Sequence, residues 1–196
     1  MPAPRTTTIS EQIRESVATL AALADHEGLL RAIADRLASC LDAGGTLYLC
    51  GNGGSAADAQ HVAAEFVGRF LRERRPLPAI ALSCNTSILT AIGNDYEFAE
   101  VFARQVRAHV TGRDCVIGIS TSGRSPNVLR ALEAARAVGA STIGFTGASG
   151  RDLAALCDVC LLAPSTATPR IQEAHLLAWH LVCDEVERRV VSGGAS

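Results

Sequence analysis

Apolar positions in the first part of the chain recur at the spacing of a helix. Two stripes follow this spacing on either side of the polar residues 25–28: Ile9, Ile13, Val17, Leu20 and Ala24, then Leu29, Leu30, Ile33, Leu37 and Leu41. Steps of three and four residues place side chains on one helix face. The pattern predicts a long N-terminal helix or a broken pair, whose apolar face covers a sheet or packs against another subunit.

Five short apolar runs follow, and helical patterns separate them. The runs predict strands at Thr46–Cys50, Ala79–Leu82, Cys115–Ser120, Thr142–Thr146 and Val159–Leu162. The patterns between and after them predict helices at Ser55–Leu71, Thr86–Gly93, Glu97–Val110, Pro126–Val138, Asp152–Leu156 and from Pro169 or Arg170 to Val191. Such alternation is typical of a parallel sheet covered on both faces. We expect an α/β fold with a five-stranded parallel sheet, in one domain spanning residues 1–196.

Composition narrows the class of protein. Of 196 residues, 48% are hydrophobic and 19% charged, as in a globular enzyme, and the net charge of −2 argues against nucleic-acid or membrane-surface partners. No apolar run approaches the roughly 20 residues of a membrane helix, and the first ten residues lack an apolar signal core. Seven cysteines lie scattered through apolar segments, and the one C-x-x-C pair, Cys157 and Cys160, has no second pair to complete a zinc knuckle. We expect a cytoplasmic protein whose thiols stay reduced.

The segment from the first strand into the next helix carries the first candidate site. Gly51, Asn52, Gly53, Gly54 and Ser55 form a glycine-rich turn at which backbone N–H groups can approach a ligand. The turn matches neither the dinucleotide fingerprint nor a Walker loop. His61 and Glu65 follow four residues apart, so they share one helix face and form a candidate metal- or substrate-binding pair, or a plain surface contact.

Hydroxyl groups gather where the third strand ends. Ser120, Thr121, Ser122 and Ser125 precede a helix that Pro126 opens. Hydroxyls at a helix N-terminus suit a phosphate, and four of them exceed what a helix cap needs, so phosphate binding is favoured over capping. The polar residues after the second strand, and Asn94 with Asp95 at the end of the following helix, fit a pocket rim or a cap equally well. Gln172 and His180 lie eight apart on one face of the last helix.

These segments together resemble one known family. GNGGSAADAQH, SILTAIGNDYEF, ISTSGRSPNV, GFTGASG and RIQEAHLLAWH are similar to the motifs of sugar isomerase (SIS) domains, and most closely to those of the phosphoheptose isomerases. The resemblance implies a flavodoxin-like sheet and a homotetramer whose sites lie at subunit interfaces. It also implies one zinc ion per subunit. The N-terminal helical region, residues 1–44, matches only in pattern and is expected to serve oligomerisation.

The resemblance also implies roles for individual residues. Those matching metal ligands are His61, Glu65, Gln172 and His180, and the proposed acid/base pair is Glu65 with His180. Those matching substrate contacts are Asn52, Gly53, Gly54, Ser55, Glu65, Asn94, Asp95, Ser120, Thr121, Ser122, Ser125 and Gln172. Pro169 departs from family members that carry an acidic residue at this position. A zinc-bound carboxylate is a weaker base, so Glu65 is not expected to fill both roles at once.

The activity implied is conversion of sedoheptulose 7-phosphate to D-glycero-D-manno-heptose 7-phosphate through an enediol, the first step of bacterial ADP/GDP-heptose synthesis. An alternative is a non-catalytic SIS adaptor that binds a replication initiator protein. The adaptor lacks the acid/base pair that Glu65 and His180 match here, which favours the enzyme. A SIS transcription regulator would need a DNA-binding domain for which the chain has no room.

Overall fold

The computed structural model describes residues 7–193 and has a five-stranded sheet in the order β2-β1-β3-β4-β5. All neighbouring strands are parallel. The strands are β1 (Leu47–Gly51), β2 (Ala79–Ala81), β3 (Cys115–Ser120), β4 (Ser141–Gly147) and β5 (Val159–Ala163). Each lies within one residue of its predicted bounds, because buried parallel strands read as continuous apolar runs. This order is the flavodoxin-like one, in which ligands bind where the strand order reverses, here between β1 and β3.

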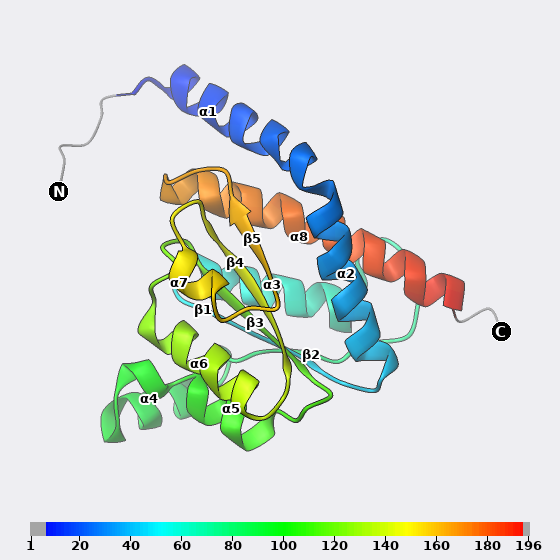
Figure 1. The fold of residues 1–196 in the computed structure, drawn as a ribbon, viewed down its shortest axis with the longest axis vertical. Helices are drawn as coiled ribbons and strands as arrows, with labels where there is room; N and C mark the ends of the chain where they lie inside the picture. The colour runs from blue at the N-terminus through cyan, green and yellow to red at the C-terminus, as the bar shows by residue number, and fades with distance from the viewer. Residues whose placement is uncertain (1–6, 194–196) are drawn as a thin grey trace.

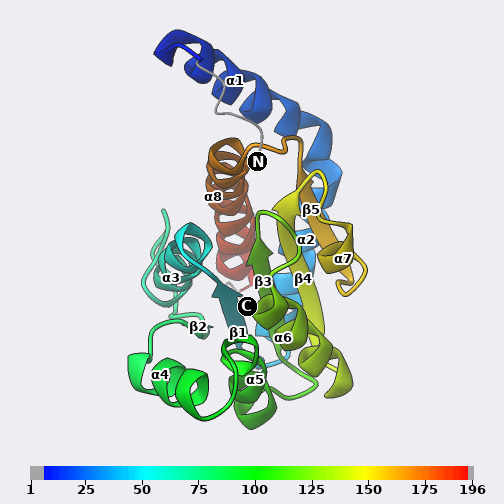
Figure 2. The ribbon, with the colours of Figure 1, turned by 90° about the vertical axis from the view of Figure 1, so that its left-hand side faces the viewer.

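Helices cover both faces of the sheet, as predicted (Figure 1). One face carries α2 (Glu27–Asp42), α3 (Gly54–Val67) and α8 (Thr168–Gly193). The other carries α4 (Thr86–Asp95), α5 (Ala103–His109), α6 (Pro126–Ala137) and α7 (Arg151–Ala154). Strand side chains alternate between two cores: Leu47 and Leu49 of β1 enter the first, and Tyr48 and Cys50 the second. Figure 2, turned by 90°, shows α3 and α8 side by side on the first face.

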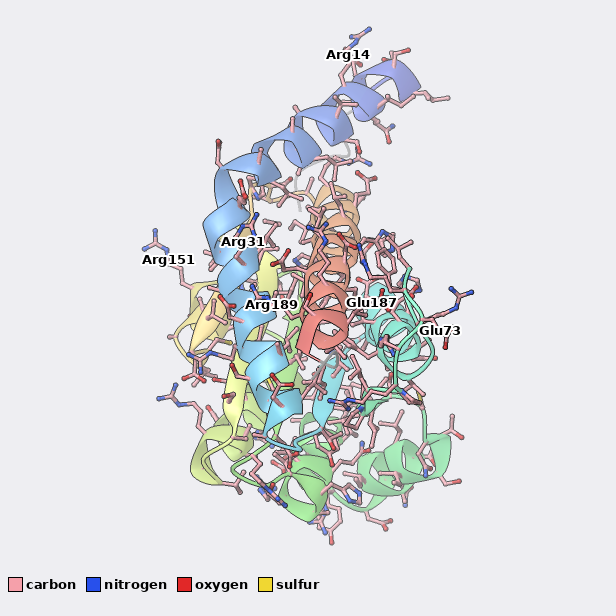
Figure 3. The ribbon with its side chains drawn as sticks, turned by 90° about the vertical axis from the view of Figure 1, so that its right-hand side faces the viewer. Arg14, Arg31, Glu73, Arg151, Glu187 and Arg189 are labelled. Atoms are coloured by element: carbon pink, nitrogen blue, oxygen red, sulfur yellow. The ribbon has the colours of Figure 1, made fainter. Side chains whose placement is uncertain are left out.

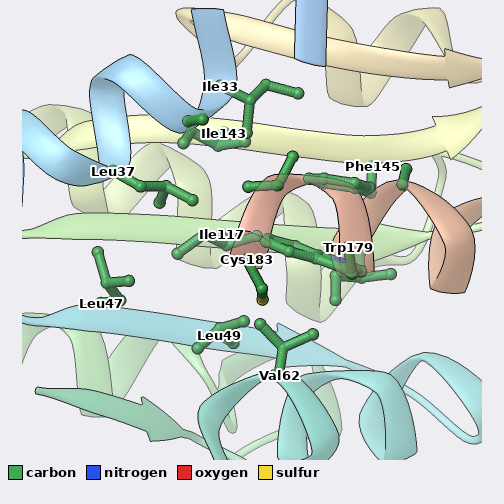
Figure 4. Close-up of a cluster of buried hydrophobic side chains, with 14 of the residues drawn as sticks. Ile33, Leu37, Leu47, Leu49, Val62, Ile117, Ile143, Phe145, Trp179 and Cys183 are labelled. Atoms are coloured by element: carbon green, nitrogen blue, oxygen red, sulfur yellow. The ribbon is translucent and has the colours of Figure 1, made fainter. Parts of the chain in front are cut away.

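The first core joins α3 and α8 to the sheet. Trp179 of α8 stacks on Phe145 of β4 with ring centroids 4.1 Å apart, and Val62 of α3 packs into the same cluster (Figure 4). All three side chains are fully buried. Burying each such side chain contributes about 1.5–3 kcal/mol. This packing fixes α3 and α8 relative to each other and to the sheet.

The N-terminal region is a broken pair. α1 (Ile9–Ala21) begins at a capping box formed by Thr8 and Glu11, and a 3-10 turn, η1 (Ala22–His26), links it to α2. Only α2 lies on the sheet, whereas α1 extends away from the body (Figure 1). On α1 the apolar stripe remains exposed, with exposed fractions of 78% at Ile9, 58% at Ile13 and 62% at Val17.

Several predicted helices were wrong in extent, two of them because of an exposed apolar side chain. α3 ends at Val67 rather than Leu71, and the helix predicted over residues 97–110 is a 3-10 turn, η2 (Phe98–Glu100), followed by α5. In both cases an apolar side chain outside the core had extended the pattern: Leu71 is 61% exposed and Phe98 62%. α4 in turn runs two residues beyond its predicted end and takes in Asn94 and Asp95. No helix within residues 7–193 combines the length and hydropathy of a bilayer-spanning segment.

Candidate active site

Two loops meet at the carboxyl ends of β1 and β3, which pair directly. The first loop, residues 52–54, leads into α3, and Gly53 has a φ of +55°, a region that glycine adopts without strain. A Cβ on Gly51 would lie 2.7 Å from the carbonyl oxygen of Ser55, so this position also requires glycine. Ser55 itself is buried, 3% exposed, in the first turn of α3. The glycines therefore let the helix start close behind the strand, as the sequence predicted.

Asn127 is a site residue that the sequence analysis missed. Its Nδ2 donates to Oδ1 of Asn52, and Nδ2 of Asn52 donates to Oδ1 of Asn127, both at 2.8 Å. Asn127 lies in the first turn of α6 and is 2% exposed. The pair ties the loop after β1 to the helix that follows the serine-rich loop. Asn127 lies in the motif ISTSGRSPNV, which was the available signal. Its partner Asn52 lies 75 residues away, so no local pattern indicated their contact.

The serine-rich loop, residues 120–125, follows β3. Oγ of Ser120 lies 2.9 Å from Oγ of Ser125 and 3.5 Å from Oγ of Ser122, which in turn accepts a hydrogen bond from the backbone N–H of Arg124. Ser125 occupies the N-cap position of α6 but makes no side-chain cap hydrogen bond. Capping therefore does not explain the hydroxyl cluster. Three hydroxyls at a helix N-terminus form an arrangement able to bind a phosphate.

The loop that follows β4 supports the serine-rich loop. Gly123 has a φ of +67°, and a Cβ on it would lie 2.3 Å from Cα of Gly150, so the two loops touch backbone to backbone. The carbonyl of Thr121 accepts a hydrogen bond from the N–H of Gly147 at 3.1 Å. The GFTGASG turn thus supports the serine-rich loop. Thr121 contributes its backbone to this support.

His61, Glu65 and His180 come together between α3 and α8. Nε2 of His61 lies 3.2 Å from Nε2 of His180 and 3.5 Å from Oε1 of Glu65. The Glu65 side chain is 19% exposed and that of His61 42%. On its other side His180 stacks on Phe70, with ring centroids 5.4 Å apart and planes 23° apart. A carboxylate and two imidazoles in one partly buried cluster are groups that can accept and donate protons.

The donor set of this cluster suits zinc. In tetrahedral zinc sites, bond lengths of 2.0–2.1 Å place ligand atoms roughly 3.3 Å apart. The separations of 3.2 and 3.5 Å around Nε2 of His61 are close to that value. Within residues 7–193, no three His, Cys, Asp or Glu side chains surround a common point as a complete metal site. The spacing of these nitrogen and oxygen atoms therefore fits zinc. The described residues do not, however, form a complete coordination shell.

Gln172 lies near the start of α8, against the first loop. A Cβ on Gly54 would lie 2.2 Å from Nε2 of Gln172, so glycine at position 54 leaves room for this amide. Eight residues, about 12 Å of helix rise, separate Gln172 from His180. Gln172 thus links the loop after β1 to the helix that carries His180.

Asn94 and Asp95 are not brought to this site. Both are exposed at the end of α4, where Nδ2 of Asn94 donates to Oδ1 of Asp95 at 2.8 Å. Figures 1 and 2 both show α4 on the opposite side of the sheet from α8. Asn85, which the sequence left open, is a helix cap, because its side chain accepts from the N–H of Ile88 at 3.1 Å.

Two ionisable groups on the helices of the cluster have shifted pKa values: half-buried Asp58 on α3 and buried His175 on α8. Burial raises the pKa of Asp58, one turn before His61, while the charge of His61 opposes that rise. Among the described residues, Oδ2 of Asp58 has no hydrogen-bond partner. Burial also lowers the pKa of His175 on α8 to about 4, against a hydrogen bond to the carbonyl of Thr146 that raises it. Since a carbonyl only accepts, Nε2 of His175 carries the proton in that 3.2 Å contact.

Comparisons with known proteins identify the family and the fold. The SIS domain family matches residues 11–147. A phosphoheptose isomerase of Burkholderia pseudomallei is 49% identical over 187 residues, covering 94% of this chain and 95% of that protein. One of Rhodospirillum rubrum is 57% identical over 152 residues, covering 78% and 81%. A solved structure of phosphoheptose isomerase from Neisseria gonorrhoeae superposes with a TM-score of 0.86 at 41% identity, covering 92% of this chain and 97% of that one.

Proposed function

The chain belongs to the SIS domain family, in the branch of the phosphoheptose isomerases, and from this we propose that it interconverts a ketose phosphate and an aldose phosphate. The observation that carries the proposal is the meeting of Glu65 with the His61–His180 pair beside α3. A ketose–aldose isomerisation needs a base near the carbon acid and an acid for the carbonyl oxygen. The cluster holds one carboxylate and two imidazoles for these tasks.

The substrate we propose is sedoheptulose 7-phosphate, and the product D-glycero-D-manno-heptose 7-phosphate. The names of the relatives support the heptose, and the hydroxyl cluster at the start of α6 supports the phosphate. The product would feed bacterial ADP/GDP-heptose synthesis as its first step. We assign the phosphate to Ser120, Thr121, Ser122 and Ser125, and the sugar to Asn52, Gly53, Gly54, Ser55, Glu65, Asn94, Asp95 and Gln172.

In the proposed reaction, Glu65 removes the proton from the carbon next to the carbonyl. His180 then protonates the carbonyl oxygen, which gives the enediol. Glu65 then returns the proton to the former carbonyl carbon, and His180 takes the proton from the hydroxyl of the neighbouring carbon, which becomes the new carbonyl. Both residues end in their starting states, and in the reverse direction Glu65 again acts on carbon and His180 on oxygen. The partly buried setting of Glu65 limits competition from water for these transfers.

We propose that His61, Glu65, Gln172 and His180 hold one zinc ion per subunit. The support is the donor set and the spacing around Nε2 of His61. When bound, zinc supplies a Lewis acid that polarises a carbonyl. Glu65 would serve either as a zinc ligand or as the base, because a zinc-bound carboxylate is a weaker base.

We also propose that residues 1–196 form one domain that assembles as a homotetramer, with sites at the subunit interfaces. The exposed apolar stripe of α1 supports an oligomer-forming role for residues 1–44. The position of Asn94 and Asp95 away from the other site residues supports their use in a neighbouring subunit's site. We place the enzyme in the cytoplasm because the seven cysteines are free thiols, as in a reducing compartment.

One assay tests the activity. Purified protein is incubated with sedoheptulose 7-phosphate, and formation of the aldoheptose is followed by NMR. Fructose 6-phosphate and unphosphorylated sedoheptulose serve as matched substrates that change only the chain length or the phosphate. We expect turnover of the phosphorylated heptulose well above both. Absence of turnover with all three would overturn the enzyme and favour the adaptor.

A further inference from the structure

A buried ion pair lies directly behind the candidate acid/base cluster. Nη2 of Arg74 lies 3.1 Å from Oε1 of Glu187, and the two side chains are 2% and 1% exposed. Removing two charges from water costs several kcal/mol each, so such a pair is weak grounds for a stabilising role. The backbone groups that these two side chains also bind indicate a different role.

Glu187 holds the segment that follows α3. Its Oε1 accepts the backbone N–H of Phe70 at 2.7 Å, and its Oε2 accepts those of Leu71 and Arg72 at 2.8 and 2.9 Å. Burial alone raises the pKa of Glu187, but the three N–H donors and Arg74 outweigh it, so the pKa lies below its ordinary value. The carboxylate is therefore held charged, fixing three successive residues to α8.

Arg74 holds the end of α3. Its Nη2 donates to the carbonyl of Glu65 at 2.6 Å, and its Nη1 donates to those of Phe66 and Gly68 at 2.8 and 2.9 Å. Carbonyls in the last turn of a helix lack partners within the helix, so the guanidinium acts as their cap. One of these carbonyls belongs to Glu65, the candidate base. Arg74 thus fixes the backbone of that residue.

The segment held by Glu187 reaches the candidate acid. Phe70, whose N–H binds Glu187, stacks on the imidazole of His180. Glu187 follows His180 by seven residues, two turns along the same face of α8. Arg72 forms a further ion pair with Asp184 on α8. The buried pair therefore connects the backbone of Glu65 with the ring that packs on His180.

We propose that Phe70, Arg74 and Glu187 form a positioning clamp that sets the placement of Glu65 relative to His180. None of the three is a catalytic residue, and the inference rests on the proposed function. Proton transfer requires hydrogen-bond reach between the catalytic group and the reacting atom, and a misplacement of about 1 Å can cost roughly 100-fold in rate. If the three residues were purely structural, their substitution would lower the stability of the protein but leave turnover per folded molecule unchanged.

Matched substitutions separate the two roles. Glu187→Gln removes the buried charge, and Glu73→Gln removes a carboxylate from the same segment whose side chain is 92% exposed. Figure 3 shows Glu73 at the outer edge of the molecule and Glu187 between α8 and α3. Phe70→Leu keeps an apolar side chain but loses the ring, and Phe70→Tyr restores it. The full-length protein is assayed with sedoheptulose 7-phosphate, with the folded fraction checked by circular dichroism.

We expect Glu187→Gln and Phe70→Leu to lower kcat at least tenfold with KM within twofold, Phe70→Tyr to recover most of kcat, and Glu73→Gln to match the wild type. A second readout needs no substrate. The ring protons of His180, assigned in NMR spectra with His180→Gln, should lose the ring-current shift of Phe70 in Phe70→Leu and change in Glu187→Gln.

An active wild type whose folded Glu187→Gln and Phe70→Leu variants keep kcat, or whose His180 signals do not move, overturns the clamp and leaves the isomerase intact. If Glu187→Gln does not fold, Phe70→Leu decides by the same criteria. A wild type inactive on the heptulose phosphate overturns the proposed function first, and the clamp's catalytic role with it.

Discussion

Nε2 of His61 lies 3.2 Å from Nε2 of His180, although 119 residues separate them in the chain. The contact exists because α3 and α8 pack side by side on one face of the sheet, through Val62, Trp179 and their neighbours. A hydrogen bond at this distance needs a proton on one of the two nitrogens and a lone pair on the other. We propose that this pair and Glu65, whose Oε1 lies 3.5 Å from Nε2 of His61, act together in proton exchange.

Substitution of the candidate acid or base should remove activity without unfolding the protein. We expect Glu65→Gln and His180→Gln each to lower kcat/KM by roughly 10²–10⁴-fold, the contribution of a positioned acid or base. The double variant should be scarcely worse than the worse single variant, because the two act as one unit. The measurements are turnover by NMR and folded content by circular dichroism. Full turnover by Glu65→Gln would refute its role as base.

Loss of hydroxyls from the serine-rich loop should weaken binding more than turnover. A hydrogen bond to a charged group contributes about 1.5–3 kcal/mol, so Ser120→Ala, Ser122→Ala and Ser125→Ala should each raise KM roughly tenfold or more. The kcat should change little, because the phosphate is bound in both ground and transition states. Ser192→Ala, which removes a hydroxyl that donates to the carbonyl of Arg188 on its own helix, is the control. Unchanged KM in all three loop variants would leave the hydroxyl cluster with a structural role only.

The amide pair between the two loops should behave as one coupled element. Asn127→Ala leaves the side chain of Asn52 without its partner, which should cost about 1–3 kcal/mol of the free energy of unfolding and raise KM. In the double variant Asn52→Ala/Asn127→Ala, the two losses should be clearly less than additive. Urea unfolding of the four proteins measures this coupling. Strict additivity would show that the reciprocal hydrogen bonds do not couple the loops.

His175 should make stability depend on pH below neutrality. Its pKa is about 4 in the folded protein and near 6.5 when unfolded, so between these values the unfolded state binds the extra proton. Stability should therefore fall as the pH drops from about 6.5 to 4, by up to about 3 kcal/mol from this group, and be unaffected by it above pH 6.5. His175→Gln retains a donor for the Thr146 carbonyl but does not titrate. Urea unfolding against pH should give a shallower slope for the variant, and parallel curves would contradict the assignment.

The exposed stripe of α1 should hold the oligomer together. Ile13→Glu/Val17→Glu places charges on that face and should yield smaller species in size-exclusion chromatography with light scattering. If sites are shared between subunits, activity should fall by the same fraction as the assembled species. Ala18→Glu adds a charge to another exposed position of α1 and should leave both unchanged. A variant that forms only the smaller species and keeps full activity would exclude active sites shared between subunits.

Much of the fold followed from the order of residues. The central strands β1, β3 and β4 are almost entirely buried and all five strands appear as continuous apolar runs, so their bounds were predicted to within one residue. The candidate loops at residues 52–55 and 120–125 were equally visible, because glycine where φ is positive and hydroxyls before a helix are local requirements. His61 and Glu65 were paired by helix period alone.

Tertiary packing decided the rest. The end of α3 at Val67 and the start of α5 at Ala103 could not be predicted, because Leu71 and Phe98 look like core residues and are exposed. Asn127 and the Arg74–Glu187 pair were missed because their partners lie far away in sequence and no local pattern marks a contact across elements. Local chemistry fixes what each segment can do, whereas the packing of α3 against α8 determines which groups meet.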